Sequence, residues 1–272
     1  MSDSKQGRFT GSFPEYYDRY LVPMQFAPYA QLLADRAKAL APSCVLETAA
    51  GTGILTQELV RRLPSGVMIT ATDLNQPMID HARAKPGMAG VTWQQADAMN
   101  LPFPDWKFDL IVCQFGVMFF PDKQTAFREA SRVLQPGGKF LFGVWDDYRT
   151  MGDAPIAIAA GVAGSMLERE PLSLLSPPYH DEDTIRADLM AEGFGAVHVD
   201  RISQPARAAS AREAAVITVQ GSMIRTAIEA ADPGRLNEAT HAVERAMLAR
   251  FGSGPIEGAT NALIVTAEKP SA

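Results

Sequence analysis

The sequence predicts an α/β protein built on a doubly wound, mostly parallel sheet. From residue 44 to residue 145, short β-rich runs alternate with helical runs, which is the pattern of strand–helix–strand units with right-handed crossovers. The run FDLIVCQF at 108–115 is apolar almost throughout, as is typical of a central strand buried on both faces. A glycine turn directly follows the first predicted strand, at the edge where open α/β sheets bind ligands.

The first strand–helix units lie before residue 85. Val45–Thr48 is an apolar strand that ends at the glycine turn, and a helix with leucines four residues apart follows it as far as Pro64. Leucines at this spacing share one helix face, and proline ends the helix. Val67–Thr72 is the second strand, and Pro77 begins a helix over Met78–Ala84, because proline is favoured in the first helical turn.

The next units complete the central part of the sheet. Val91–Gln95 is the third predicted strand and 108–115 is the fourth. Lys123–Leu134 is a helix with its apolar residues on one side, and Gln135–Gly138 ends it with the turn Gln-Pro-Gly-Gly. The fifth predicted strand is Lys139–Trp145.

The rest of the chain is more helical. Helices are predicted over Gly152–Arg169, Asp183–Glu192 and about Asn237–Arg250. Val197–Ile202 and Asn261–Glu268 are two late strands, and too many residues separate them for a hairpin.

Three segments fall outside the strand–helix alternation and are predicted to form one helical lid over the carboxyl edge of the sheet. They are 1–43, about 146–180 and about 204–258. We therefore expect an N-terminal lid segment over 1–43, followed by one α/β domain over 44–272 that carries the other two as insertions.

Composition narrows the possible partners. The chain has 272 residues, of which 47% are hydrophobic, enough for one large α/β domain. No run approaches the roughly 18 apolar residues of a membrane span, and the polar start predicts a cytoplasmic rather than a secreted protein. The formal charge is −6 without a dense basic run, which argues against nucleic-acid binding.

Cysteine and histidine usage points away from disulfides and metals. Cys44 and Cys113 each lie in an apolar run, so we expect buried free thiols in a reducing compartment. The four histidines are scattered without metal-ligand spacing, so no metal site is predicted.

The run VLETAAGTGILT at 45–56 is the most informative motif. Glu47 ends the strand, and Ala49, Gly51 and Gly53 place small residues at alternate positions before the helix. Small residues let the backbone turn sharply and approach a ligand, and the helix N-terminus then offers N–H groups to a carboxylate or phosphate. Dinucleotide sites and S-adenosylmethionine sites share this pattern.

Acidic residues at two further strand ends describe an adenosine-binding clamp. Asp73 ends the second strand, where a carboxylate can accept hydrogen bonds from ribose hydroxyls. Asp97 follows the third strand and is placed to accept from an adenine amino group, while the Ala98 N–H can donate to the ring. Met78, one helical turn after Asp73, can cover the adenine face.

With these motifs the chain resembles the class I S-adenosylmethionine-dependent methyltransferases, in the group that includes the ubiquinone-biosynthesis methyltransferases. The resemblance covers residues 45–145 and extends more loosely to a bacterial subgroup through PEYYDRYLVPMQFAPYA at 14–30 and the C-terminal third. The motifs that carry it are LETAAGTG in 46–53, ATDLN at 71–75, ADAMNLPFPDWKFD at 96–109, CQFGVMFFPD at 113–122 and RVLQPGGKFLFGVWD at 132–146.

The resemblance implies a Rossmann-like sheet of seven strands whose last strand, here 261–268, is antiparallel. It implies that S-adenosyl-L-methionine is the cofactor and S-adenosyl-L-homocysteine the product. The candidate cofactor-binding residues are Glu47, Ala49, Gly51, Thr52, Gly53, Asp73, Leu74, Met78, Asp97, Ala98 and Gln114. Ala49 stands where the family usually has glycine, a change that is tolerated unless the turn requires a positive φ.

Two other functions remain open at this level. Gly51-Thr52-Gly53 could begin the G-x-G-x-x-G motif of a nicotinamide-dependent oxidoreductase, but Thr56 occupies the third glycine position, where a small residue is needed. The motifs describe cofactor binding alone, so a module that binds S-adenosylmethionine without turnover also satisfies them.

Several residues near the expected methyl-transfer centre are candidate contacts, and some of them have two possible roles. Gln114 and Phe115 end the fourth strand beside the expected methyl-transfer centre, and Glu47 either organises the glycine loop or lies near the cofactor's ammonium group. Tyr17 or Tyr16 either packs the lid or closes over the cofactor sulfonium, whose charge suits an aromatic face.

His180 is a candidate general base. The alternative is that it has no chemical role and that the neighbouring Asp181 caps a helix. His180 and Tyr17 are thus the only candidates for a catalytic group.

The expected acceptor is a small, largely apolar molecule that is aromatic, quinone-like or polyketide-like and is methylated on O, N or C. Monomer and homodimer are equally compatible with the sequence. The apolar residues expected to line its cavity or pack the lid are Phe119, Phe120, Ile156, Ile158, Met166, Leu167, Leu172, Leu174, Leu175, Met223, Ile224 and Met247.

Overall fold

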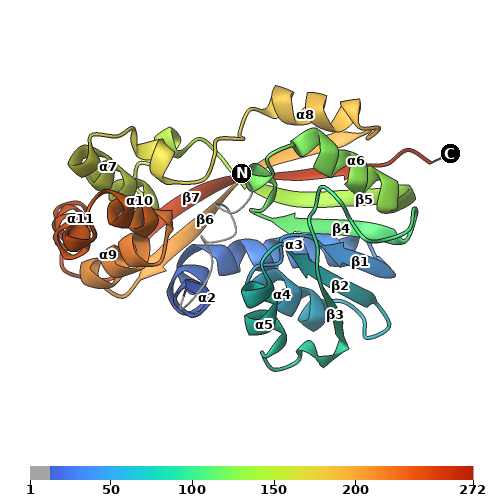
Figure 1. Cartoon of the computed structure of the whole chain (residues 1–272), viewed down its shortest axis with the longest axis horizontal. Helices are drawn as coiled ribbons and strands as arrows, with labels where there is room; N and C mark the ends of the chain where they lie inside the picture. Colours follow the sequence, from blue (N-terminus) through green and yellow to red (C-terminus); the bar gives the residue numbers. More distant parts are fainter. Residues whose placement is uncertain (1–12, 272) are drawn as a thin grey trace.

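The computed structural model describes residues 13–271, which form a seven-stranded sheet in the order β3-β2-β1-β4-β5-β7-β6 (Figure 1). Its strands are β1 (Cys44–Glu47), β2 (Met68–Asp73), β3 (Val91–Gln95), β4 (Phe108–Gln114), β5 (Leu134–Trp145), β6 (Val197–Ala208) and β7 (Ile256–Glu268). The pairs among β1 to β5 are parallel, and β7 runs antiparallel to both of its neighbours, β5 and β6. The doubly wound α/β fold with an antiparallel last strand is therefore confirmed.

Strand order reverses between β1 and β4, because the chain proceeds outward from β1 to β3 and then returns to place β4 on the other side of β1. This reversal is the topological switch point, where the carboxyl ends of neighbouring strands diverge and leave a crevice for a ligand. The glycine turn that follows β1 lies at this crevice.

Helices cover both faces of the sheet (Figure 1). The helices α3 (Ala27–Ala39), α4 (Ile54–Arg62) and α5 (Gln76–Arg83) lie on one side, where α3 packs against α4. The helices α6 (Lys123–Val133) and α8 (Glu182–Ala191) pack against each other on the other side. The 3-10 turns are η3 (Met88–Gly90), η4 (Val117–Phe119), η5 (Tyr148–Thr150), η6 (Pro171–Leu174) and η7 (Pro233–Arg235).

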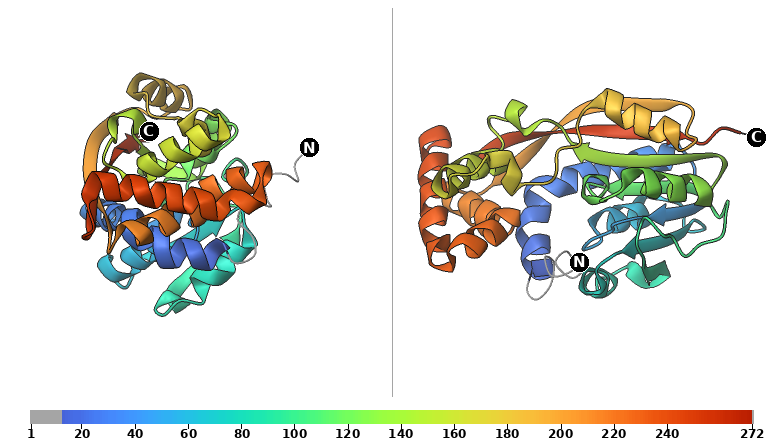
Figure 2. Two further views of the ribbon diagram at one scale, coloured as in Figure 1. Left: turned by 90° about the vertical axis from the view of Figure 1, so that its left-hand side faces the viewer. Right: turned by 45° about the horizontal axis from the view of Figure 1, so that its top comes forward.

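Four helices form a separate unit at the far end of the long β6–β7 ribbon. They are α7 (Pro155–Leu167), α9 (Ala211–Gln220), α10 (Met223–Ala231) and α11 (Leu236–Phe251), and each contacts the other three. We call them the helical unit. The N-terminal segment, made of α2 (Phe13–Tyr16) and the π-helix η2 (Tyr17–Phe26), lies between this unit and the central strands (Figure 2, right).

The structure differs from the prediction in three places. Of the segment 1–43, residues 1–12 lie outside the described residues, and α3 packs on a sheet face against β4 and β5. The predicted turn Gln135–Gly138 is part of β5, where the pairing with β4 shifts register between Phe108 and Leu110. The late strands are longer than predicted, because each pairs with the other beyond the edge of the sheet.

Both cysteines are buried and free, as predicted, and burial raises the pKa of the Cys113 thiol to about 12. Within residues 13–271 no helix combines the length and apolar character needed to cross a bilayer. The same residues contain no cluster of three side chains able to hold a metal ion.

Candidate cofactor and methyl-transfer site

The glycine loop between β1 and α4 is held from both sides by neighbouring strands. The Thr48 N–H donates to the Val112 carbonyl of β4 at 3.0 Å, and the Ala50 N–H donates to the Thr72 carbonyl of β2 at 2.9 Å. Gly53 adopts a φ of 81° and precedes the first residue of α4. A Cβ there would lie 3.0 Å from the Ala82 Cβ, so glycine is also needed for close packing against α5.

Ala49 occupies the left-handed region, with a φ of 53°, so the turn does require the conformation that glycine adopts freely. This conformation costs a non-glycine residue about 1–2 kcal/mol. Gly116, just after β4, makes room for the Ala49 side chain: a Cβ at Gly116 would lie only 2.6 Å from the Ala49 Cβ. The alanine is accommodated at the cost of backbone strain.

Asp73 is joined to the glycine loop by a hydrogen bond. Its Oδ2 accepts from the Gly51 N–H at 2.8 Å, and its Oδ1 accepts from the Asn75 N–H at 2.8 Å. Burial raises the pKa of Asp73, and these hydrogen bonds partly offset the effect. The Asn75 side-chain amide also donates to Oδ1, at 3.2 Å. Because a carboxylate oxygen has two lone pairs, Oδ2 is the oxygen that keeps a site for a ribose hydroxyl.

Glu47 is buried inside the loop. Its Oε2 accepts a hydrogen bond from the Thr56 hydroxyl of α4 at 2.6 Å. Burial raises its pKa to about 8, although the Thr56 bond acts in the opposite direction. The contact with Thr56 matches the loop-organising interpretation of Glu47.

The predicted adenine side lies next to Asp73. The Ala96 N–H donates to the Asp73 carbonyl at 3.0 Å, which brings Asp97 and Ala98 to the neighbouring strand end. The Asp97 Oδ1 accepts from the Met99 N–H at 2.9 Å. Met78 is buried in α5, whereas Leu74 is 41% exposed.

Aromatic rings gather where β4 and β5 end. Phe115 stacks on Trp145 with ring centroids 3.8 Å apart, and Phe26 of η2 packs against both rings. The sequence prediction singled out Phe115 but missed Trp145 and Phe26. Trp145 could have been predicted from the sequence, because it ends β5, the strand adjacent to β4, at the same edge of the sheet.

Gln114 connects β4 to the N-terminal segment. Its Nε2 donates to the Phe26 carbonyl at 2.9 Å. Its Oε1 is buried and has no hydrogen-bond partner within residues 13–271. An unpaired buried amide oxygen is costly, so a bound ligand would relieve it.

Tyr17, rather than Tyr16, packs with the ring cluster at the ends of β4 and β5. Its ring packs against Phe26 at 5.3 Å. Burial raises the pKa of the Tyr17 phenol, and the charges of Asp18 and Asp73 raise it further, so the phenol lies near the predicted ribose-binding carboxylate. Tyr16 is 38% exposed and packs on Tyr20 instead.

His180 lies beside Trp145 of the ring cluster. It lines a water-sized cavity of about 10 Å³ together with Trp145, Tyr148 and Ser176, and its Nε2 is 3.9 Å from an Asp147 oxygen. The neighbouring Asp181 accepts from the Thr184 N–H at 2.8 Å. Asp181 therefore does cap α8, as the alternative interpretation of this pair predicted.

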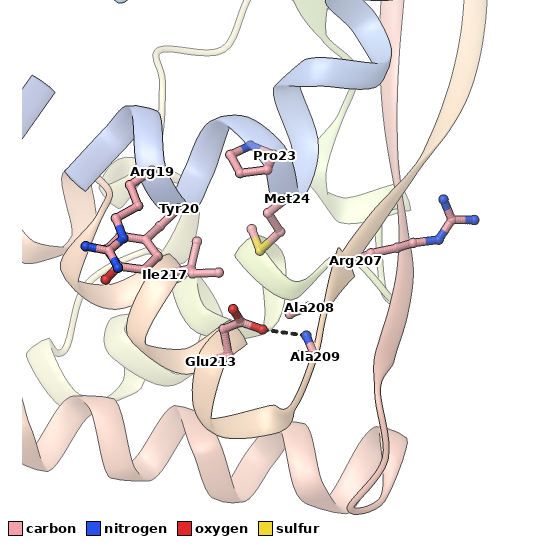
Figure 3. A pocket seen from close by; sticks show the side chains of 9 residues that line it. All are labelled: Arg19, Tyr20, Pro23, Met24, Arg207, Ala208, Ala209, Glu213 and Ile217. Carbon is pink, nitrogen blue, oxygen red and sulfur yellow. Dashed lines mark hydrogen bonds between the residues drawn. The ribbon is translucent and has the colours of Figure 1, made fainter. Parts of the chain in front are cut away.

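A larger cavity, of about 200 Å³, lies behind η2, between it and the start of α9 (Figure 3). No predicted cofactor residue lines it. Arg207 at its edge points away from the other lining residues (Figure 3) and pairs with Glu257 of β7. The lining residues are Arg19, Tyr20, Pro23, Met24, Arg207, Ala208, Ala209, Glu213 and Ile217.

Comparison with known proteins agrees with this geometry. Residues 46–142 match the family described as "Methyltransferase domain". The chain is 31% identical over 170 residues to the ubiquinone/menaquinone biosynthesis C-methyltransferase UbiE of Laribacter hongkongensis, which covers 58% of this chain and 70% of that protein. It is 39% identical over 110 residues to the demethylmenaquinone methyltransferase of Deinococcus radiodurans, covering 40% of this chain and 45% of that enzyme.

Solved structures share the fold at low sequence identity. The YcgJ protein of Bacillus subtilis has a TM-score of 0.57 at 20% identity, covering 90% of this chain and 99% of that one. The [4+2]-cyclase SpnF has a TM-score of 0.55 at 19% identity, covering 90% and 82%. A protein described as a cyclase thus shares the fold, so the fold alone does not determine the reaction.

The chain spans about half the length of curated relatives such as those from Deinococcus radiodurans and Thermus thermophilus. The match to the Laribacter protein extends over more than two thirds of that relative, and the glycine loop, acidic strand ends and strand order agree with it. The chain therefore belongs to the class I S-adenosylmethionine-dependent methyltransferase family, in the group of the UbiE enzymes.

Proposed function

We propose that the protein transfers a methyl group from S-adenosylmethionine to a small acceptor and releases S-adenosylhomocysteine. The observation that carries this proposal is the hydrogen bond from the Gly51 N–H to Asp73. It joins the glycine loop and the acidic end of β2 into one cradle at the switch point of the sheet. Family membership supports the same reaction.

The residues of the cradle fit this cofactor. Asp73 Oδ2 offers a free lone pair to the ribose, and Asp97 lies at the adjacent strand end for the adenine. Two more buried polar atoms beside the loop, Thr52 Oγ1 and Trp93 Nε1, have no hydrogen-bond partner within the described residues. Polar atoms left unpaired in this way are expected where a polar ligand completes the site.

The cofactor supplies a methyl group already activated by a sulfonium, so the protein's task is to align the acceptor and exclude water. Phe115, Trp145 and Phe26 form an apolar wall at the ends of β4 and β5. We place Tyr17 over the sulfonium, because it lies near Asp73 and an aromatic face favours a cation.

Proton removal is needed only for some acceptors. The pKa of Asp147 is lowered to about 2, chiefly by its hydrogen bond to Arg149, so this carboxylate stays ionised beside His180. His180 is thus the group we propose for taking a proton from a hydroxyl or ammonium acceptor, and an acidic phenol or enol does not require it.

The proposed acceptor is a small aromatic or quinone-like molecule. The relatives' names mention ubiquinone and menaquinone biosynthesis, and the ring cluster offers an apolar surface for a flat molecule. Some of the apolar residues expected to line the acceptor cavity or pack the lid lie in the core: Ile156, Leu174, Leu175, Ile224 and Met247. Phe119 is 41% exposed, and the side chain of Leu172 lies outside the described residues.

The nicotinamide alternative is disfavoured by Thr56. Its side chain is buried and bonded to Glu47, so the position does not offer the small residue that pyrophosphate binding uses. The alternative of a module that binds the cofactor without turnover is separated from the enzyme by an acceptor screen that measures released S-adenosylhomocysteine.

Calorimetric titration tests the cofactor assignment. We expect S-adenosylmethionine to bind the wild-type protein and NADH not to bind. Asp73→Ala removes the ribose acceptor and should weaken S-adenosylmethionine binding at least about tenfold, the loss of roughly 1.4 kcal/mol that a hydrogen bond to a charged group provides. Binding of NADH alone would overturn the proposal.

A further inference from the structure

An ion pair beside a histidine fastens the N-terminal segment to the end of α5. Asp18 in η2 pairs with Lys85, two residues beyond α5, and its other carboxylate oxygen lies 3.3 Å from the His81 Nε2. We call Asp18, Lys85 and His81 the clasp. Asp18 is 24% exposed and Lys85 is 13% exposed, so solvent and salt screen this pair less than an exposed one.

The clasp connects elements that enclose the cofactor cradle. The helix α5 follows Asp73 in the chain, and its Ala82 packs against the glycine loop at Gly53. On the other side, Asp18 directly follows Tyr17. The other charged pair of α5, Asp80 with Arg83, is exposed and lies within the helix, so it does not reach the N-terminal segment.

We infer that Asp18 is a positioning residue, which holds Tyr17 against the bound cofactor through its pairing with Lys85. The inference rests on the proposed function, since it assigns the clasp a role at that same site. The segment from Phe13 to Phe26 separates the cradle from the cavity behind η2. The cofactor then leaves only when the clasp opens, and the strength of the ion pair sets its rate of release.

The release rate of S-adenosylhomocysteine tests the clasp. Asp18→Asn and Lys85→Met should each raise the dissociation rate, measured by stopped-flow displacement, by about tenfold, equivalent to roughly 1.4 kcal/mol. The double variant should release no faster than the faster single variant, because both changes remove the same pair. Lys85→Arg, which keeps a cation, should restore slow release.

Asp80→Asn is the matched control, because it makes the same carboxylate-to-amide change on α5 without touching η2. Its release rate should equal that of the wild type. A thermal unfolding curve for each variant shows whether the protein is folded. If Asp18→Asn is unfolded, Lys85→Met is the variant compared with Asp80→Asn.

A spectroscopic readout separates positioning from general loosening. The methyl resonance of S-adenosylmethionine labelled with ¹³C at the methyl group shifts when an aromatic ring lies over it. Asp18→Asn should move this resonance in the same direction as Tyr17→Leu, and Asp80→Asn should leave it in place.

The possible failures are distinguishable. A wild-type protein that binds neither S-adenosylmethionine nor its product overturns the proposed function. A wild-type protein that binds both, with release and methyl resonance unchanged by Asp18→Asn and Lys85→Met, overturns the clasp alone.

Discussion

At the scale of single residues, burial changes the ionisation of Glu47, whose carboxyl group then helps to hold the glycine loop. The carboxyl group sits beneath the glycine turn and accepts from Thr56 at 2.6 Å, and its pKa is raised to about 8. At neutral pH it is therefore mostly protonated and can both donate and accept a hydrogen bond.

This protonation makes stability depend on pH. A carboxyl group whose pKa is higher in the folded state contributes stability that is fully present below its unfolded value, near 4.5, and is lost as the pH rises through about 8. The slope within this window is at most about 1.4 kcal/mol per pH unit. Glu47→Gln cannot ionise and keeps an acceptor for Thr56, so its stability should fall less than that of the wild type between pH 5 and pH 8.

Urea unfolding at both pH values measures this difference. Thr56→Val serves as the comparison, because it removes the hydrogen bond and leaves the carboxyl group able to titrate. Equal pH dependence in wild type and Glu47→Gln would show that Glu47 is not the group that titrates.

The sequence predicted residue types at the site better than it predicted conformations. Glu47, Asp73 and Asp97 were predicted as site residues from their places at strand ends, and Gly51 from the glycine turn. In the structure Gly51 donates to the Asp73 carboxylate and Ala96, next to Asp97, donates to the Asp73 carbonyl. The positive φ of Ala49 was not predictable, because it depends on the space that Gly116 leaves across a strand boundary.

At the scale of elements, local signals predicted the helices that begin with a side-chain cap. Asp181 accepts from the Thr184 N–H and begins α8. We expect Asp181→Ala to lower the free energy of unfolding by about 1 kcal/mol, the typical value of an N-cap. Asp181→Ser retains a capping oxygen and should lose less, as measured by urea unfolding.

Comparing Asp181→Ala with His180→Gln separates the role of Asp181 from that of its neighbour His180. In the folded protein, Asp181→Ala should leave the rate of product formation nearly unchanged. If His180 is catalytic, His180→Gln should lower that rate. Equal loss of activity in both variants would contradict a purely structural role for Asp181.

The lengths of strands that depend on tertiary contacts were not predicted correctly. The β6–β7 ribbon continues to the pair Ala208 and Ile256, although the apolar pattern of β6 stops at Ile202. In this part of the ribbon each strand is stabilised by its pairing with the other, and that pairing cannot be predicted from the local sequence. The turn Gln135–Gly138 is likewise drawn into β5 by its pairing with β4, since tertiary context overrides local propensity.

At the scale of the whole molecule, the protein is a sheet and a helical unit joined by one long ribbon. The ribbon meets the helical unit where Gly258 of β7 passes beneath the start of α7. A Cβ at Gly258 would lie 2.0 Å from the Asp153 carbonyl oxygen and 2.9 Å from the Pro155 ring. Arg250 of α11 pairs with Asp153 at the same place, so this junction fixes the position of α7 and α11 on the ribbon.

Gly258→Ala should therefore displace the helical unit without touching the cofactor cradle. Because the nearest atoms belong to the backbone, relief requires movement of the chain, and overpacking of this kind costs about 1–3 kcal/mol. We expect urea unfolding to show this loss, and proteolysis to cut the segments between α7 and α11 faster than in the wild type. Binding of S-adenosylmethionine should change little, because Gly51, Asp73 and Asp97 lie on the other half of the sheet.

Gly254→Ala is the control for this variant, since an added Cβ there meets nothing within 4 Å and its φ is not positive. If Gly258→Ala weakened S-adenosylmethionine binding as strongly as Asp73→Ala, the helical unit and the cradle would form one coupled site. If it left binding intact but abolished methyl transfer, the unit would act through the acceptor. The second result is the one that the architecture predicts, because the ribbon carries the unit past the ring cluster and away from the ends of β1 and β2.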